Sequence, residues 1–353
     1  MNPPAERPTL QTIARRTGLS GAAVSLALRN HPSIPRATCL RVQRAADRLG
    51  YQRDPEVAKL MAYLRRSRVN RSRGTLGLIT QFPQPSPWRT IPHLELLHAA
   101  AVARARQHGY ALDEYWLAEP GMTPARLREV LFARGVEGVL LLAAPRWTEC
   151  LDFDFAPFAC AATGYSVRNE LHRACQHQYQ EMFLALQRLE ALGYRRPGLS
   201  LTEDADARTM HHWSAAFLSY QSRLPAALRL PILLAPRLSA EVFAPWFRRH
   251  RPDVVISQSP PVPVVAGWLR DLGVAVPADC GVADLDIDPQ TDLDCSGIRQ
   301  NYPEVAAAAV DLVVSQIQRG ERGVPMHPRV VLIRGAWVDG TTTRPQRPAP
   351  QTG

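Results

Sequence analysis

The most constraining feature of this 353-residue chain is a run of short amphipathic helical segments between Thr9 and Gly50. Thr9 is a good N-cap for a first helix whose apolar side chains recur at helical spacing. Gly18 suits the tight turn that ends this helix, because glycine has no Cβ. Ser20 then caps a second helix over residues 21–29. The chain therefore begins with two short helices joined by a tight turn.

The spacing of small and apolar residues indicates how these helices pack. Ala14 is small where two helices cross, Gly18 follows four residues later, and Val24 follows six after that. A third helix over 35–49 opens with Pro at its first turn and ends at Gly50. This pattern is typical of a helix-turn-helix, whose second helix enters the major groove of DNA.

The basic charge is confined to the same end of the chain. Residues 1–74 hold 15 Lys and Arg against 4 Asp and Glu, a net charge of +11, whereas the whole chain carries +10. Residues 75–353 are therefore close to neutral, at −1. A basic surface on one small domain is what phosphate contacts require. The alternative, a solvated basic helical domain with no nucleic-acid role, explains the charge but not the motif.

Four short motifs in this head closely resemble those of LacI/GalR-type transcriptional regulators: Gly18-Leu19-Ser20, Val24-Ser25, Leu28-Arg29-Asn30 and Leu49-Gly50-Tyr51. The resemblance is specific in the head and extends over the rest of the chain as an order of elements. It implies a DNA-binding regulator, expected to act as a repressor, that binds a near-palindromic operator as a homodimer.

The second helix departs from the usual pattern of that family. Its exposed positions are small or apolar, and Leu26 stands where the family often has Arg. Such side chains can contact a thymine methyl group but cannot form bidentate bonds to a base edge. Base-edge bonds are expected from Ser25, Arg29 and Asn30, and phosphate contacts from Thr9 and Ser20. The predicted DNA-contacting set in the head is Thr9, Ser20, Gly21, Ala22, Ala23, Ser25, Leu26, Arg29 and Asn30.

A hinge and linker are expected over residues 54–74. Pro55 fits the first turn of a short helix, and residues 67–74 are polar and basic. The family resemblance implies a hinge helix whose leucine wedges into a minor-groove step, and Leu60 is the matching residue. Such wedges unstack a base step and bend the duplex. The alternative is that Leu60 packs against the regulatory body.

The body over residues 75–340 is predicted to be α/β, with two doubly wound parallel-sheet lobes like those of periplasmic binding proteins. Apolar strands alternate with helices throughout. Lobe crossings are expected near residues 163–167, 288–296 and 323–328. The tail over 341–353 is rich in Pro, Gln and Thr, and is expected to be disordered. The predicted strands are 76–80, 110–116, 139–142, 158–162, 197–201, 232–234, 254–257, 281–283 and 329–333.

A small-molecule effector is expected between the lobes, since ligands of open α/β sheets bind at the carboxyl ends of the strands. Aromatic side chains with a few polar groups favour a sugar-like or heteroaromatic ligand. However, Ser259-Pro260 stands where the family often has Asn-Asp, and Trp213 replaces a family Arg, so an atypical effector or none is also possible. The predicted effector-binding residues are Gln81, Phe82, Trp88, Tyr165, Trp213, Gln258, Ser259 and Asp286.

Other classes of protein are less consistent with the sequence. The motifs GxSxG, GxxxxGK[ST], HExxH and GxGxxG at a strand–helix junction are absent, so neither catalysis nor a cofactor is expected. Adjacent His211 and His212 would point about 100° apart on a helix, which disfavours a metal site. The six scattered cysteines and the lack of an apolar leader or membrane span favour a reduced, cytoplasmic protein. The alternatives are a solute-binding protein, a ligand-independent DNA-binding regulator and an enzyme with an added head.

Overall fold

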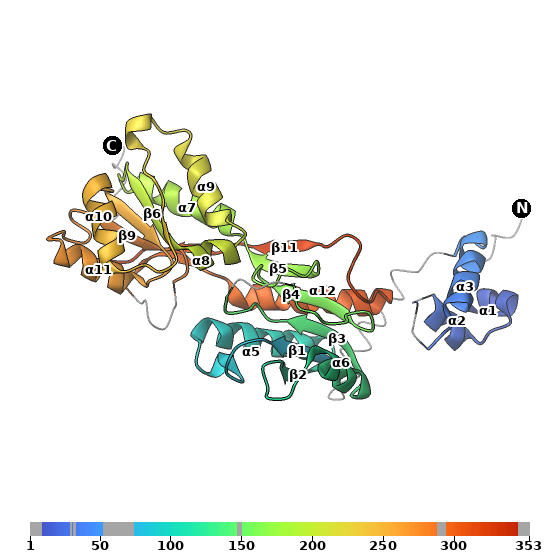
Figure 1. Cartoon of the computed structure of the whole chain (residues 1–353). Helices are drawn as coiled ribbons and strands as arrows, with labels where there is room; N and C mark the ends of the chain where they lie inside the picture. The colour runs from blue at the N-terminus through green and yellow to red at the C-terminus, as the bar shows by residue number, and fades with distance from the viewer. Residues whose placement is uncertain are drawn as a thin grey trace, which may run out of the picture.

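The structure is a computed structural model, and it describes residues 9–28, 30, 33–51, 74–146, 150–287 and 294–344. The head contains helices α1 (Leu10–Thr17), α2 (Gly21–Ala27) and α3 (Arg36–Arg48) (Figure 1). Its small core joins all three helices through fully or almost fully buried side chains. These are Ile13, Val24, Ala27, Cys39, Val42 and Ala46. The predicted three-helix head is confirmed, although the second helix ends at Ala27 rather than at residue 29.

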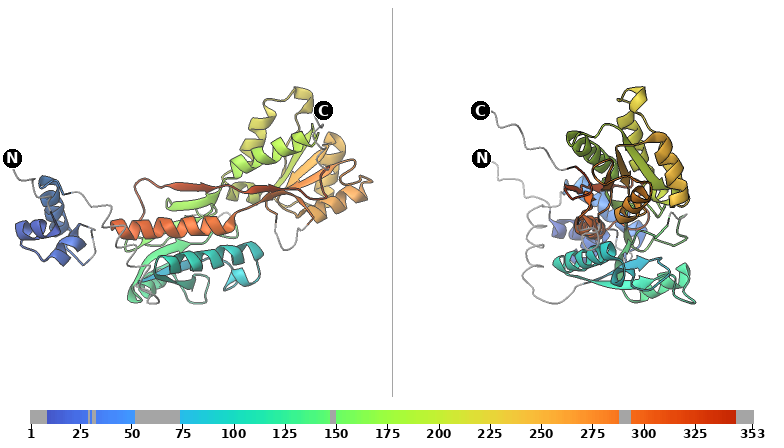
Figure 2. Two further views of the ribbon diagram at one scale, coloured as in Figure 1. Left: turned by 180° about the vertical axis from the view of Figure 1, so that it is seen from behind. Right: turned by 90° about the vertical axis from the view of Figure 1, so that its left-hand side faces the viewer.

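The first lobe is built on a six-stranded sheet in the order β11-β5-β4-β3-β1-β2, in which every neighbouring pair is parallel. Helices α5 and α12 lie side by side along this sheet (Figure 2). The strands are β1 (Gly74–Thr80), β2 (Tyr110–Trp116), β3 (Val136–Leu141), β4 (Ala159–Thr163), β5 (His172–Gln176) and β11 (Val330–Ile333). The helices are η1 (Pro87–Arg89), α5 (Pro92–Gln107), α6 (Pro124–Ala133) and α12 (Tyr302–Arg319).

The second lobe repeats this plan with the strand order β12-β10-β9-β8-β6-β7. Its pairs are parallel except for β12, which runs antiparallel to β10 at the sheet edge. The strands are β6 (Pro197–Thr202), β7 (Leu233–Ala235), β8 (Val254–Ser257), β9 (Gly281–Asp284), β10 (Ser296–Arg299) and β12 (Ala336–Val338). The helices are α7 (Gln178–Ala191), α8 (Glu203–Arg208), α9 (His212–Gln221), η2 (Ala226–Leu228), α10 (Ala240–His250) and α11 (Val262–Asp271).

The central strands of both lobes are buried on both faces, which explains their uninterrupted apolar sequences. In the first lobe, one face of the sheet packs against α5 and α12 and the other packs against α6 and the segment before β4. In the second lobe, α7 and α9 cover one face while α10 and α11 cover the other. The predicted pair of doubly wound, mostly parallel lobes is therefore confirmed.

The three predicted lobe crossings are wrong, because three short strands were not recognised. The chain leaves the first lobe after β5, at Gln176–Gln178, and returns between β10 and α12, at Gln300–Asn301. It crosses for the last time between β11 and β12, at Arg334–Gly335. Strands β5 and β10 contain polar residues such as His172 and Arg299, and β12 has only three residues, so none of the three presents a long apolar run.

The predicted tail begins too early. Thr343 is almost fully buried, and its hydroxyl lies 2.7 Å from that of Ser296 on β10. The Arg344 backbone N–H donates to the Tyr194 hydroxyl, and its guanidinium lies over the Tyr194 ring. Residues 341–344 therefore belong to the second lobe, and 345–353 lie outside the described residues. No helix in the described part of the chain is both long enough and apolar enough to cross a membrane.

Candidate DNA-binding head and lobe boundary

Two side-chain caps hold the head's helices in a helix-turn-helix. Thr9 and Thr12 form a reciprocal capping box at the start of α1, with backbone-to-hydroxyl distances of 3.3 Å. Ser20 caps α2 by accepting from the Ala23 N–H at 3.2 Å. Gly18 adopts a φ of +67° in the turn between the helices, where a side chain would be strained. Thr9 and Ser20 thus have structural roles that do not require DNA.

Helix α2 buries Val24 and Ala27 and leaves its first residue, Gly21, exposed. A Cβ added at Gly21 would meet no other atom. Ala23 and Leu26 are half-buried. Backbone at such a position can approach a groove closely, because no side chain keeps it away. The side chains of Ala22 and Ser25 and the whole of Arg29 and Leu60 lie outside the described residues, so their predicted DNA contacts stay predictions.

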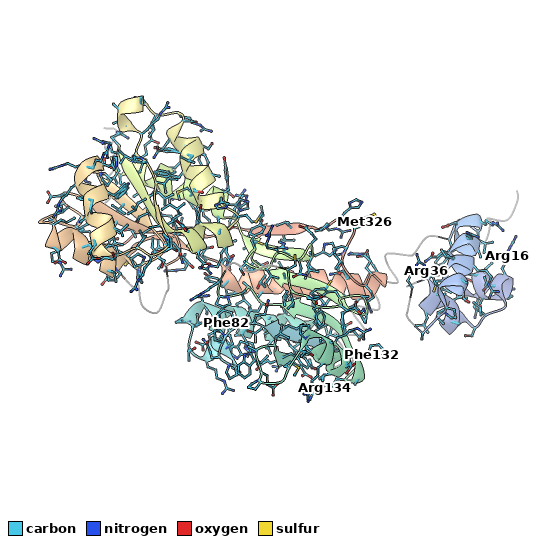
Figure 3. All side chains as sticks on the ribbon, viewed as in Figure 1. Arg16, Arg36, Phe82, Phe132, Arg134 and Met326 are labelled. Atoms are coloured by element: carbon cyan, nitrogen blue, oxygen red, sulfur yellow. The ribbon has the colours of Figure 1, made fainter. Side chains whose placement is uncertain are left out.

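Asn30 is exposed, but part of its hydrogen-bonding capacity is already used. Gln43 on α3 donates from Nε2 to Asn30 Oδ1 at 2.8 Å. Asn30 also adopts a left-handed φ of +51°, which Asn tolerates better than most residues. Around it, basic side chains lie exposed on two helices, and Figure 3 labels one at the end of α1 and one at the start of α3. The exposed arginines of the head are Arg15, Arg16, Arg36, Arg41, Arg44 and Arg48.

The carboxyl ends of the two sheets meet at the boundary between the lobes, where two contacts join them. The Tyr302 hydroxyl, from α12, donates to Asp286 Oδ2 after β9 at 2.6 Å. Burial and the nearby Asp286 charge raise the pKa of Tyr302 well above its ordinary value, so this hydroxyl keeps its proton. Tyr165, after β4, lies edge-on to His212 at the start of α9, with ring centroids 5.1 Å apart.

Two predicted effector residues offer unused hydrogen-bonding atoms at this boundary. Gln81 follows β1, and its Nε2 is buried without a partner among the described residues. Gln258 follows β8, and its Oε1 is likewise buried and unpaired in the described part of the chain. Unpaired buried polar atoms are costly, so a bound ligand or water that satisfies them would be stabilising. Ser259 is half-buried beside Gln258.

The predicted aromatic residues are divided between the cores and the boundary. Phe82 and Trp88 belong to the core of the first lobe, and Trp88 stacks on His98 with centroids 4.4 Å apart. Trp213 lies in the core of the second lobe, although its indole Nε1 has no partner among the described residues. Of the predicted aromatics, Tyr165 therefore makes the cross-lobe contact, and periodicity could not distinguish it from the buried ones.

Sequence reasoning did not single out Asp206. It is almost fully buried in α8, the short helix that follows β6, where His211 Nδ1 lies 2.7 Å from Oδ2. The Ser214 hydroxyl donates to the same oxygen at 2.9 Å. Because Ser214 binds the carboxylate and not the imidazole, this group lacks the serine–histidine bond of a nucleophilic triad. Among the described residues, no three His, Cys, Asp or Glu side chains form a group able to hold a metal.

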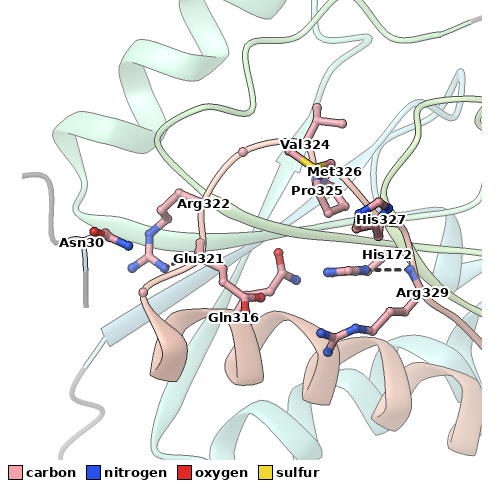
Figure 4. A pocket seen from close by; sticks show the side chains of 12 residues that line it. Asn30, His172, Gln316, Glu321, Arg322, Val324, Pro325, Met326, His327 and Arg329 are labelled. Atoms are coloured by element: carbon pink, nitrogen blue, oxygen red, sulfur yellow. Dashed lines mark hydrogen bonds between the residues drawn. The ribbon is translucent and has the colours of Figure 1, made fainter. Parts of the chain in front are cut away.

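A cavity of about 500 Å³ lies at the other end of the first lobe, where α12 ends and the chain turns back into β11 (Figure 4). His172 Nδ1 accepts from the Arg329 backbone N–H there at 2.9 Å. Burial and the nearby Arg329 charge lower the pKa of His172, which favours the neutral ring. This loop was expected to cross between lobes, but it returns to the first lobe and so lies away from the lobe boundary.

A helix-turn-helix head followed by two doubly wound lobes defines a DNA-binding regulator with a ligand-binding type of body. Residues 9–54 match the family of bacterial regulatory proteins of the lacI type, and residues 186–343 match the periplasmic binding protein-like domain. The chain therefore combines a LacI-family helix-turn-helix domain with a periplasmic-binding-protein-like domain.

One curated relative is an uncharacterised HTH-type transcriptional regulator from the aml 5′ region of Streptomyces limosus, which is 28% identical over 205 residues. The alignment spans 56% of this chain and about half, 53%, of that relative.

Solved structures share the fold at low sequence identity. The cellobiose complex of the transcriptional regulator CelR is 17% identical with a TM-score of 0.55, covering 95% of this chain and 100% of that one. A lac repressor dimer bound to operator and the anti-inducer ONPF is 16% identical with a TM-score of 0.55, covering 96% and 99%. A LacI-type protein from Alkaliphilus metalliredigens complexed with D-xylulofuranose is 16% identical, with a TM-score of 0.55 and coverage of 76% and 98%.

Proposed function

We propose that this protein is a sequence-specific repressor whose affinity for a near-palindromic operator is controlled by a small molecule bound between the two lobes. The observation that supports it most strongly is the head: a capped helix-turn-helix in which Gly21 at the start of α2 is exposed and which carries exposed arginines on α1 and α3. A single head makes few contacts with DNA, so two heads joined in a homodimer would be needed for tight binding.

The effector proposed for the boundary is neutral and hydrogen-bonding. Two carboxylates are already committed, since Asp286 accepts from Tyr302 and Asp206 from His211 and Ser214. The unpaired Gln81 amide and Gln258 carbonyl would instead bind a ligand with both acceptor and donor groups. Cellobiose and D-xylulofuranose, which are bound in two solved structures of similar fold, are ligands of this chemical kind. We further propose a cytoplasmic location, where the operator would lie.

The apolar face of α5 is not available for the homodimer interface. Leu94, Leu97, Ala101 and Ala105 pack inside the first lobe, where α5 lies against α12. The outer, more polar face of α5 stays available for a partner subunit. Sedimentation of the full chain at micromolar concentration would give the mass of two subunits if the proposal is right.

Selection of bound duplexes from a random pool at physiological salt tests DNA recognition directly. Two enriched half-sites whose centres lie about one helical turn apart are expected. Leu60→Ala is the informative variant for the hinge, because loss of a minor-groove wedge should weaken operator binding far more than it changes the head's stability. Salt-sensitive binding with no enriched sequence would instead mean a nonspecific DNA-binding protein.

A further inference from the structure

All three connections between the lobes meet at one buried side chain, Glu181. This residue lies in the first turn of α7, directly after the first crossing. Its Oε1 accepts from the backbone N–H of Gly335, in the third crossing, at 2.9 Å. Its Oε2 accepts from Nε2 of Gln300, in the second crossing, at 3.0 Å. One carboxyl group therefore ties together the three segments whose backbone must rotate when the lobes move.

The packing around this carboxyl group is close and almost dry. Glu181 is 2% exposed and Gln300 is 7% exposed. A Cβ added at Gly335 would come within 2.9 Å of Glu181 Oε1 and 2.8 Å of the Arg299 carbonyl oxygen. Glycine at 335 is thus what lets the third connection approach the carboxyl group. Small changes in the hydrogen bonds of Glu181 must consequently displace at least one connection.

The observed hydrogen bonds are those of an ionised carboxyl group, since both oxygens accept from N–H donors. Protonation would give one oxygen a hydrogen that needs an acceptor. Gln300 Oε1 is buried and has no partner among the described residues, so it can supply that acceptor if the amide turns over. Turning the amide would break the bonds from Gln300 Nε2 to Glu181 and to the Leu285 carbonyl oxygen, the latter 2.8 Å long. The two ionisation states therefore require different arrangements of the second connection.

The surroundings make both states accessible near neutral pH. Burial raises the pKa of Glu181 to about 8, against the opposing effects of the Gly335 N–H and the Gln300 amide. The negative charge of Asp286 raises it further. Tyr302, the other titratable group that faces this carboxyl, keeps its proton because its own pKa is raised.

We propose that Glu181 is a proton-sensitive tie between the three lobe connections, and that its ionisation favours the lobe arrangement seen in this structure. Its loss of charge releases Gln300 and shifts the lobes toward a second arrangement. A pH-dependent operator affinity follows from this tie, and that consequence alone rests on the proposed function as an operator-binding regulator.

Hydrogen–deuterium exchange of the full-length protein tests the tie without DNA. Glu181→Gln imitates the protonated group, because its amide can donate to Gln300 Oε1 while its oxygen accepts from Gly335. At pH 6, wild type and Glu181→Gln should protect the peptides containing residues 300 and 335 equally. At pH 9, where a carboxyl group with a pKa of about 8 is roughly nine-tenths ionised, the wild type should protect them more strongly than Glu181→Gln does. Glu190→Gln removes a half-exposed carboxyl from the same helix and should match the wild type at both pH values.

Operator affinity provides the second readout, measured for the same three proteins at pH 6 and pH 9 and at constant salt. The difference between wild type and Glu181→Gln should appear at pH 9 and vanish at pH 6. A difference of the same size at both pH values, in exchange or in affinity, would show a merely structural role and overturn the proposal, as would identical behaviour throughout. If no protein binds any operator, the proposed function fails, while the exchange comparison still decides on the tie.

Discussion

Asn30 shows how the local structure of a residue limits the function that its position suggests. It lies just after the recognition helix, where a base-reading side chain was expected. Bidentate recognition of adenine by Asn needs both its oxygen and its amide nitrogen. Here the oxygen already accepts one hydrogen bond from Gln43, which fixes the orientation of the amide and leaves its two N–H groups as the less committed atoms. This geometry favours a phosphate contact over a base-edge contact.

Asn30→Gly is therefore expected to weaken binding to all DNA sequences alike, by about 1 kcal/mol, without changing the selected half-site. Glycine is the appropriate replacement, because the φ of +51° suits it and the backbone need not move. The measurement is a duplex selection with wild type and variant in parallel. A changed base preference at one half-site position would show that Asn30 reads a base after all.

Glu181 provides a prediction about stability as well as lobe arrangement. Its pKa is raised from an ordinary 4.5 to about 8, so the folded state binds this proton more tightly than the unfolded state does. The stabilisation is fully present below pH 4.5 and is lost as the pH rises through 8. Exchange at residues 300 and 335 compares two folded arrangements, whereas melting compares the folded with the unfolded state. Thermal unfolding between pH 5 and pH 9 should therefore show the Tm of wild type falling relative to that of Glu181→Gln, even though the wild type is locally better protected at pH 9. A constant Tm difference over this range would contradict the raised pKa.

At the scale of elements, the first lobe depends on close contact between α12 and the sheet. Gly138 on β3 lies directly beneath this helix, where an added Cβ would overlap Val313 and come within 3.2 Å of the Ala159 carbonyl oxygen. Val313 is fully buried. Helix α12 can pack this close to the sheet because Gly138 leaves room for the branched side chain of Val313.

Gly138→Ala should destabilise the protein by about 1–3 kcal/mol through overpacking. Val313→Ala alone should cost about 2 kcal/mol, because it removes buried methyl groups and leaves a cavity. In the double variant, the new methyl group occupies space that Val313 vacated, so the combined loss should be smaller than the sum. Urea unfolding of the four proteins measures this coupling. Strict additivity would mean that the helix, and not the valine, limits the space at position 138.

The same scale shows where sequence patterns succeeded and failed. Strand β8 and helix α10 were predicted with their observed bounds, because each presents an unbroken apolar run or a clear amphipathic period. Strands β5 and β10 were missed because they are short and contain polar residues, and β12 was missed because it has only three residues; all three are stabilised by pairing with neighbouring strands. Because these strands were missed, all three lobe crossings were predicted at the wrong residues. These crossings are the segments that control lobe movement.

At the scale of the whole molecule, the net charge differs between the DNA-binding head and the two-lobed body. The basic excess lies in residues 1–74, and the rest is near neutral. Exposed arginine pairs nevertheless occur in both parts, at Arg15 and Arg16 on α1 and at Arg248 and Arg249 on α10. Replacing either pair with alanine removes the same amount of positive charge. Comparing the two variants therefore distinguishes local phosphate contacts from a general electrostatic attraction between the protein and DNA.

Operator affinity of the wild type should fall steeply with salt, as several phosphate contacts require. Arg15→Ala with Arg16→Ala should reduce the slope of log affinity against log salt by about 1–2, if each arginine contacts a phosphate. Arg248→Ala with Arg249→Ala should leave that slope unchanged. Fluorescence anisotropy between 50 and 300 mM salt, about the range in which such slopes are measured, gives the comparison. Equal effects of the two pairs would argue against a DNA contact at α1.

The sequence by itself determined the helix-turn-helix head, the class of the body and the location of the basic charge, because these follow from local periodicity, capping residues and composition. It also identified Gln81 and Gln258 as candidate effector-binding residues, since both follow apolar strands. Only the tertiary structure decided which aromatic residues are core, where the chain crosses between lobes and that Glu181, Gln300 and Gly335 meet. These contacts join residues more than a hundred positions apart, and the pairing of strands and the packing of helices bring such residues together.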